Sequence, residues 1–223
     1  MPRDVGRREF LAAASTAGLT LWFGIPGGVP TAGAIAAFEP NAWLTITPDG
    51  AITVHITKAE MGQGIGTAFA QIVAEELEAD WKDIRVDYPI NDPKFGEMLT
   101  AGSWSVALSF DTLSRAGAAA RITLIDTAAR LWAVDVADCF AARSVVRHRP
   151  TGRSIRYRTL VARVPTTKAL TADELKAIPL KTPARYTLVG RSMPRLDIPD
   201  KTTARARFGI DTFLPGMAYA KVA

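Results

Sequence analysis

The sequence contains few of the side chains that bind metal ions directly. Its 223 residues include one cysteine, Cys139, and two histidines, His55 and His148. A zinc site normally needs three or four Cys, His or carboxylate ligands, and an iron–sulfur cluster needs about four cysteines. A single cysteine also excludes an internal disulfide. We therefore expect Cys139 to be an inert buried thiol and His55 a hydrogen-bonded strand residue. Any redox metal must be held by an organic cofactor or by another subunit.

The sequence also lacks a large excess of either charge. Its 27 basic and 22 acidic residues give a formal charge of +5, and part of that excess lies in the first 36 residues. This balance does not indicate nucleic-acid binding, so no nucleic-acid partner is expected. Residues 143–163 contain seven arginines and no acid, but few aromatic residues on which bases could stack. A solvated hairpin face is predicted there, with contact to a partner subunit or to cofactor phosphates as the alternative.

No uninterrupted run of the roughly 20 apolar residues needed to span a membrane is present. The uncharged stretch over residues 11–30 is broken by several glycines and prolines. It follows the twin-arginine pattern Arg7-Arg8-Glu9-Phe10-Leu11 and precedes the small-x-small sites Ala32-Gly33-Ala34 and Ala34-Ile35-Ala36. We predict that residues 1–36 are a twin-arginine signal peptide and that the protein is periplasmic, with an uncleaved membrane anchor as the alternative. Export by this route implies a cofactor, because such proteins fold before they cross the membrane.

Beyond the leader, strand-like and helix-like patterns predict an α+β fold. Residues 43–47 and 51–57 alternate apolar and polar side chains around the turn Pro48-Asp49-Gly50, so a hairpin is expected. The other predicted elements are a helix over 65–80, a strand over 84–88, a helix over 106–132, and a second hairpin from strands over 144–146 and 154–157. The buried stripe expected on the long helix consists of Leu113, Ala116, Ala120, Leu124 and Leu131.

These elements make up a predicted lobe over residues 37–163, in which strand hairpins pack with two helices. Residues 164–201 are rich in Pro, Thr and Lys and are predicted to be an extended connector. The stretch over 208–222 is apolar and contains one turn, Pro215-Gly216, so it is expected to form the first strands of a second, truncated domain over residues 202–223.

A glycine-rich loop lies between the first hairpin and the first helix, and it contains the sequence Glu60-Met61-Gly62-Gln63-Gly64. Its glycines allow another group to approach the backbone closely, and the helix start behind it suits an anion. Gln63 is expected to project from the loop, and Glu60 to accept hydrogen bonds from nearby backbone N–H groups rather than to act as a base. A dinucleotide-binding turn is an alternative, although its third glycine would fall at Thr67. A plain tight turn is another.

The loop resembles the cofactor loop of the xanthine oxidase/aldehyde oxidase family of molybdenum hydroxylases. The resemblance implies that Gln63 hydrogen-bonds an oxo ligand of the molybdenum. The segment Thr100-Ala101-Gly102-Ser103-Trp104-Ser105 is similar to the small-residue loop that the family places at the pterin. It departs from the family at Trp104, where a small or hydroxylic residue is usual. The residues that the resemblance assigns to cofactor binding are Gly62, Gln63, Gly64, Gly102, Ser103 and Ser105.

Further stretches are similar to the isoquinoline 1-oxidoreductase beta subunits of this family. They include residues 38–43, 74–77, 115–121, 194–201, 208–211 and 214–217. The resemblance covers almost all of the chain after the leader, but only about the first third of the family's large subunit. The catalytic glutamate of the family lies beyond residue 223, so no catalytic residue is assigned in this chain.

The resemblance implies a molybdopterin cytosine dinucleotide cofactor and hydroxylation of an N-heteroaromatic or an aldehyde with oxygen from water. Electrons would pass to a small [2Fe–2S] subunit, and a cytochrome c is a candidate acceptor. The implied partners also include the remainder of the large subunit. The competing hypothesis is a non-catalytic product, either a truncated reading frame or one half of a split subunit.

Overall fold

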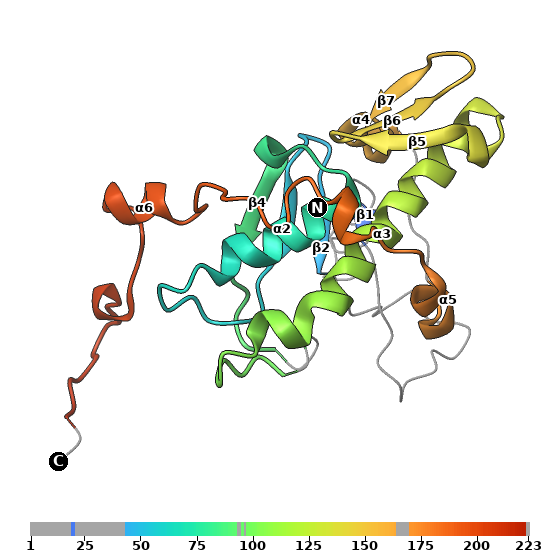
Figure 1. The fold of residues 1–223 in the computed structure, drawn as a ribbon. Helices are drawn as coiled ribbons and strands as arrows, with labels where there is room; N and C mark the ends of the chain where they lie inside the picture. Colours follow the sequence, from blue (N-terminus) through green and yellow to red (C-terminus); the bar gives the residue numbers. More distant parts are fainter. Residues whose placement is uncertain (1–18, 21–42, 93–94, 96, 164–169, 222–223) are drawn as a thin grey trace, which may run out of the picture.

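The computed structural model describes residues 19–20, 43–92, 95, 97–163 and 170–221 (Figure 1). The predicted signal peptide lies outside the described residues except for Leu19–Thr20, which form the short strand β1. The structure is α+β, with two small sheets and several helices, as the sequence patterns predict.

The first sheet has the strand order β1-β2-β3-β4. Strands β2 (Leu44–Ile46) and β3 (Ile52–His55) are antiparallel and form the predicted hairpin, and β1 pairs with β2. Strand β4 (Ile84–Asp87) lies parallel to β3, with Val54 opposite Val86. Parallel neighbours need a crossover connection, and helix α2 (Ile65–Leu77) supplies it. The predicted helix over 65–80 and strand over 84–88 are therefore confirmed.

Helix α2 lies against β3 and β4 of the first sheet, and helix α3 (Ser105–Trp132) packs along α2 and extends to the strands of the second sheet (Figure 1). The helices approach closely because a Cβ atom at Gly117 would lie 2.5 Å from the carbonyl oxygen of Val73. The predicted stripe on α3 is buried except for Leu131, which is 46% exposed because the last turn of the helix extends past α2. None of the helices in the described part of the chain is both long and apolar enough to cross a membrane.

The second sheet consists of β5 (Cys139–Ala142), β6 (Val145–His148) and β7 (Ser154–Arg156), all antiparallel. Strands β6 and β7 confirm the second predicted hairpin, whereas β5 was not predicted because its four residues carry no clear alternation. Short 3-10 helices precede β4 and β5, at Trp81–Asp83 (η2) and Val136–Asp138 (η4).

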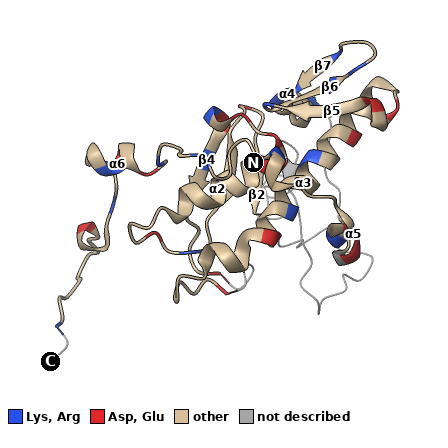
Figure 2. Ribbon diagram, viewed as in Figure 1, with Lys and Arg blue, Asp and Glu red and all other residues tan. Residues whose placement is uncertain are grey.

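Helix α4 (Tyr157–Arg163) follows β7 and joins the two sheets. The Tyr157 side chain is 1% exposed, and its hydroxyl donates to the carbonyl of Leu77 at 2.8 Å. Figure 2 shows basic residues along the second sheet and α4. The arginines there are exposed, as expected of a solvated face, and Arg149 stacks on the ring of Phe140.

Residues 170–201 contain short helices, and residues 170–197 lie against the lobe, whereas 198–201 are exposed. Helix α5 (Ala172–Ala177) begins with a capping box at Thr171, and it is followed by η5 (Pro183–Arg185) and α6 (Ile198–Thr202). Leu175 and Lys181 are each 8% exposed, so this segment contributes to the core rather than only crossing solvent.

Residues 203–221 form no strand, so the strands expected over 208–222 are absent from the described part of that segment. One 3-10 turn, η6 (Gly209–Asp211), is present. The segment runs away from the lobe in Figure 1, and five of its large apolar side chains are more than half exposed. These side chains are Phe208, Ile210, Phe213, Leu214 and Tyr219. A strand needs a neighbour, and the described residues provide none here.

Candidate cofactor-binding loops

The Glu60 carboxylate caps the start of α2. It accepts hydrogen bonds from the backbone N–H groups of Gly62 at 2.8 Å, Gly64 at 3.0 Å and Gly66 at 3.4 Å. This geometry confirms that Glu60 binds nearby backbone. It also corrects the expectation of an anion at the α2 start, because Glu60 itself supplies the negative charge there. Burial favours a raised pKa for Glu60, but these three hydrogen bonds outweigh burial and hold its pKa below the ordinary value.

Local geometry explains why glycine occupies each of these three positions of the loop. Gly62 and Gly64 have φ values of 101° and 79°, in the left-handed region that disfavours other residues. Gly66 lacks a Cβ atom because one there would lie 2.2 Å from the Tyr88 hydroxyl oxygen. Burial, followed by the charge of Glu60, raises the pKa of Tyr88 to about 12, so this phenol stays neutral beside the loop.

The Gln63 side chain is folded back onto its own loop. Its Oε1 atom accepts from the N–H of Met61 at 2.6 Å, and its Nε2 atom donates to the carbonyl of Ala59 at 2.8 Å. The expectation of a freely projecting amide is therefore wrong, although residues 61–63 are exposed. A primary amide has two N–H donors and two oxygen lone pairs, so one donor and one acceptor position remain for another partner.

The structure brings the two loops singled out by the sequence together. The N–H of Ala59 donates to the Thr100 hydroxyl at 2.8 Å. The Lys58 ammonium donates to the carbonyls of Glu97 at 3.0 Å and Leu99 at 2.9 Å. These bonds span about 40 residues of sequence and join the segments before Gln63 and before Gly102.

The start of α3 is open, in contrast to that of α2. Trp104 stands at the N-cap position without a side-chain cap, after Gly102 and Ser103 in left-handed conformation. Within the described part of the chain, the first N–H groups of α3 and the hydroxyls of Ser103 and Ser105 have no hydrogen-bond partner. Such groups at a helix N-terminus suit an anionic ligand. The Trp104 indole lies beside Gly102 and is 65% exposed, so the loop accommodates this departure from the family pattern.

A cleft of about 470 Å³ lies between the two loops, at the carboxyl ends of β3 and β4. This end of parallel strands is where α/β sheets usually bind ligands. The residues that line the cleft are Ile56, Thr57, Lys58, Ala59, Tyr88, Pro89, Asn91, Met98 and Leu99. The cleft thus borders the segments that precede Gln63 and Gly102, and none of the six residues that the resemblance assigns to the cofactor lines it. Within the described ranges, no cluster of three or more His, Cys, Asp or Glu side chains could hold a metal ion. Besides the charged Lys58 and Glu60, the loops offer open backbone N–H groups and the side chains of Gln63, Ser103 and Ser105, which are groups that can bind an organic cofactor.

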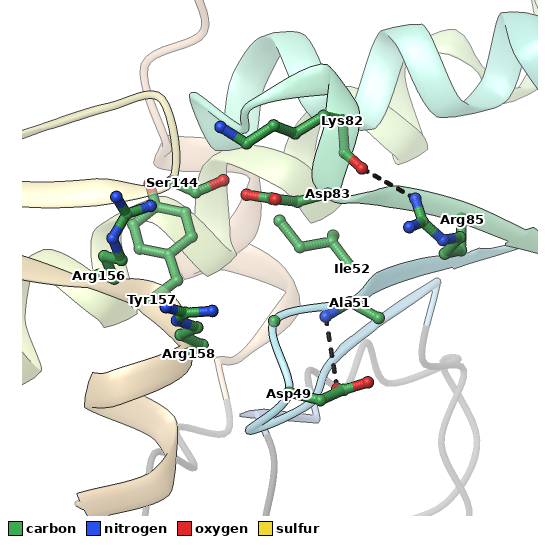
Figure 3. Close-up of a pocket in the computed structure, with 11 residues that line it drawn as sticks. Asp49, Ala51, Ile52, Lys82, Asp83, Arg85, Ser144, Arg156, Tyr157 and Arg158 are labelled. Atoms are coloured by element: carbon green, nitrogen blue, oxygen red, sulfur yellow. Dashed lines mark hydrogen bonds between the residues drawn. The ribbon is translucent and has the colours of Figure 1, made fainter.

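A second cavity, of about 210 Å³, opens at the other end of β3 (Figure 3). Its walls come from the Asp49–Ile52 turn, η2, and the junction of β7 with α4. Arg85 is fixed beside it by hydrogen bonds to the carbonyls of Lys82 and Ile84. No residue that the sequence assigns to the cofactor lines this cavity.

Sequence reasoning missed Arg195, which contacts the glycine loop, and Asp197, which holds Arg195 in place. Arg195 donates to the Gly62 carbonyl at 2.8 Å and lies 3.3 Å from a Glu60 oxygen. Asp197 holds the same guanidinium through two hydrogen bonds of 3.0 and 2.6 Å. The available signal was the close spacing of Arg195, Asp197 and Lys201 in the segment 194–201, but sequence alone did not indicate where that segment packs.

Residues 7–222 match the family described as the molybdopterin cofactor-binding domain. The chain therefore belongs to this family, the cofactor-binding domain of xanthine oxidase-family large subunits, as the resemblance implied.

Two relatives align with 98% of the chain. One is the membrane-bound aldehyde dehydrogenase [pyrroloquinoline-quinone] of Gluconacetobacter polyoxogenes, 40% identical over 229 residues. The other is isoquinoline 1-oxidoreductase subunit beta of Brevundimonas diminuta, 35% identical over 261 residues. The alignments cover 29% and 33% of these relatives, so the chain spans about a third of their length. Among solved structures, quinoline 2-oxidoreductase from Pseudomonas putida 86 aligns with 53% of this chain and 15% of its own, at 24% identity and a TM-score of 0.44.

Proposed function

We propose that this chain is the N-terminal portion of a molybdenum hydroxylase large subunit and that it binds molybdopterin cytosine dinucleotide between the 58–64 and 97–105 loops. The observation that carries the proposal is the hydrogen-bonded pairing of those loops beside one cleft, in a chain of the molybdopterin cofactor-binding family. One loop precedes β4 in the sequence and the other follows it. Both contribute residues to the lining, so neither forms the cleft alone.

The chemistry of the donor groups fits the cofactor. Open N–H groups at the α3 start, with the hydroxyls of Ser103 and Ser105, would hold an anionic part of it. The left-handed backbone at Gly62, Gly64 and Gly102 allows close approach. Gln63 would bind an uncharged polar group with its remaining N–H. When bound, the cofactor supplies two-electron oxidation of a carbon centre with oxygen from water.

The proposed parent reaction is hydroxylation of an N-heteroaromatic carbon or an aldehyde, in keeping with the names of the relatives. Electrons would pass to a small [2Fe–2S] subunit, and a cytochrome c is a candidate acceptor. By the resemblance, the family's catalytic glutamate belongs to a part of the large subunit that these 223 residues do not include. We therefore expect no turnover from this chain by itself.

The first test is the cofactor content of the full chain, produced with its large-subunit remainder and iron–sulfur subunit in a host that makes the cofactor. Molybdenum and released cytidine monophosphate should each approach one per chain. The result that contradicts the proposal is folded protein with neither. Pyrroloquinoline quinone is assayed in the same sample, because the name of one relative includes it.

A paired substitution tests the anion-binding end of the site. Ser103→Glu places a negative charge beside the α3 start, and repulsion of about 1.4 kcal/mol would lower cofactor affinity about tenfold. Ser154→Glu makes the same change on an exposed β7 residue away from both loops and should retain cofactor as wild type does. Equal cofactor content in the two variants would rule out this placement.

We also propose periplasmic localisation through twin-arginine export, on the basis of the Arg7–Leu11 pattern. Changing Arg7 and Arg8 together to Lys should retain the protein in the cytoplasm, which cell fractionation measures. Undiminished periplasmic recovery of the double variant would end this hypothesis.

A further inference from the structure

Arg195 contacts the glycine loop from a segment more than 130 residues further along the chain. Its Nη1 atom donates to the Gly62 carbonyl at 2.8 Å, and its Nη2 atom lies 3.3 Å from Glu60 Oε1. Gly62 is therefore held through both of the peptide groups that flank it, because Glu60 accepts from its N–H while Arg195 donates to its carbonyl, which belongs to the peptide group shared with Gln63. Gln63 follows this peptide directly, so the direction of its side chain depends on both contacts.

The guanidinium is itself fixed in place. Asp197 accepts from Arg195 Nε at 3.0 Å and from Nη2 at 2.6 Å, a two-point contact that only a planar guanidinium can make. Lys201, one turn later on α6, donates to the same carboxylate at 2.5 Å. The N–H of Leu196 donates to the Thr67 hydroxyl in the first turn of α2 at 3.1 Å, which anchors the segment over the loop.

We infer that Arg195 is a positioning residue of the cofactor site: by bridging Asp197 to the Gly62 carbonyl and Glu60, it sets the conformation in which the Gly62–Gly64 loop receives the cofactor. The inference rests on the proposed function in assigning a cofactor to the loop, but the contacts are independent of it. The loop acquires these contacts only where Arg195 and Leu196 lie against Gly62 and the first turn of α2. Cofactor retention is thereby linked to folding of the chain beyond the lobe.

Hydrogen–deuterium exchange of the full chain in its assembly tests the inference without requiring activity. In Arg195→Met, the amides of Met61–Gly66 should exchange at least tenfold faster, while those of the α2 and α3 core keep wild-type rates. Arg195→Lys keeps the charge but loses the planar fork, so its exchange rates should lie between wild type and Arg195→Met. The matched control is Arg205→Met, which removes an exposed arginine paired with the exposed Asp200 and should leave the loop unchanged.

Wild-type exchange at Met61–Gly66 in Arg195→Met would overturn the inference. Equal acceleration across α2, α3 and the loop would overturn it as well, because Arg195 would then support the fold in general. If Arg195→Met does not fold, the exchange rates of Arg195→Lys are compared with those of wild type instead. Faster exchange confined to Met61–Gly66 supports the inference, and unchanged or uniformly faster exchange overturns it.

The molybdenum content of the same samples separates this inference from the proposed function. Arg195→Met should lose cofactor and Arg205→Met should keep it. A wild-type assembly without molybdenum would refute the proposed function, while the exchange result would still decide whether Arg195 positions the loop.

Discussion

Lys181 and Glu75 form a buried ion pair between the predicted connector and helix α2. The Lys181 Nζ atom lies 2.7 Å from Glu75 Oε1, and the two side chains are 5% and 1% exposed. The second oxygen of Glu75 accepts from the backbone N–H groups of Thr187, Leu188 and Val189 at 2.6 to 3.0 Å. Both charges are thus fully hydrogen-bonded, and they attach the connector to the lobe that carries the cofactor loop.

Replacing Lys181 with Met should destabilise the chain strongly. The substitution leaves the Glu75 carboxylate buried without its counter-ion, which typically costs about 3–5 kcal/mol. Urea unfolding of the full chain followed by tryptophan fluorescence measures the loss. Lys176→Met is the control, because Lys176 is exposed on α5 and should change stability by less than about 0.5 kcal/mol. Similar midpoints for the two variants would show that the buried pair contributes little.

The same pair predicts how stability depends on pH. Burial alone would raise the pKa of Glu75, but the Lys181 ammonium and the three backbone N–H groups outweigh it and hold the pKa below 4.5. A carboxylate with a lowered folded-state pKa contributes stability above its unfolded pKa and loses it as pH falls through the folded value. The free energy of unfolding should therefore fall as pH decreases below about 4.5. Glu75→Gln should be less stable at pH 7 and show a shallower acid-dependent loss, and identical pH profiles would contradict this.

Gly117→Ala should destabilise the protein although alanine is the better helix former. Intrinsic propensity favours Ala over Gly by about 1 kcal/mol. However, the added Cβ atom would lie 2.5 Å from the Val73 carbonyl oxygen on α2, so the helices must separate. We expect a net loss of about 1–3 kcal/mol in urea unfolding. Gly209→Ala is the control, since a Cβ atom there meets nothing within 4 Å.

The sequence predicted the elements whose patterns depend on local geometry. The β2–β3 hairpin follows from alternation around Asp49-Gly50, and α2 and α3 follow from their apolar spacing. Glu60 was correctly expected to bind nearby backbone, because short-range hydrogen bonds follow from sequence separation. The resemblance to one family extended these predictions to the cofactor, and the family match confirmed that the chain is a molybdopterin cofactor-binding domain.

What the sequence could not predict depends on long-range packing. The contacts of Lys181 with Glu75 and of Arg195 with Gly62 join residues more than 100 positions apart, and no periodicity indicates them. The inward fold of Gln63 was missed because an amide bonds equally well to its own loop or to a ligand. The exposed apolar residues of 208–219 look like strand residues in sequence, but the described chain offers no strand beside them.

Gln63→Ala separates a chemical role of this residue from a structural one. If the amide contacts the reacting group of the bound cofactor, turnover of the complete assembly should fall roughly ten- to a thousandfold, since losing one positioned polar contact costs up to about 4 kcal/mol. Cofactor content should then stay near the wild-type level. If Gln63 only holds the loop through Met61 and Ala59, cofactor content should fall in parallel with turnover.

The matched control for Gln63→Ala is Gln71→Ala. Gln71 also uses its amide to hold backbone, donating to the carbonyls of Leu188 and Arg191 at 3.0 Å, but it lies further along α2, away from the loop. Its loss should lower stability modestly and leave turnover per bound cofactor unchanged. Wild-type turnover in Gln63→Ala would refute the assignment of the loop, because the remaining N–H of that amide is the group through which Gln63 is proposed to bind the cofactor.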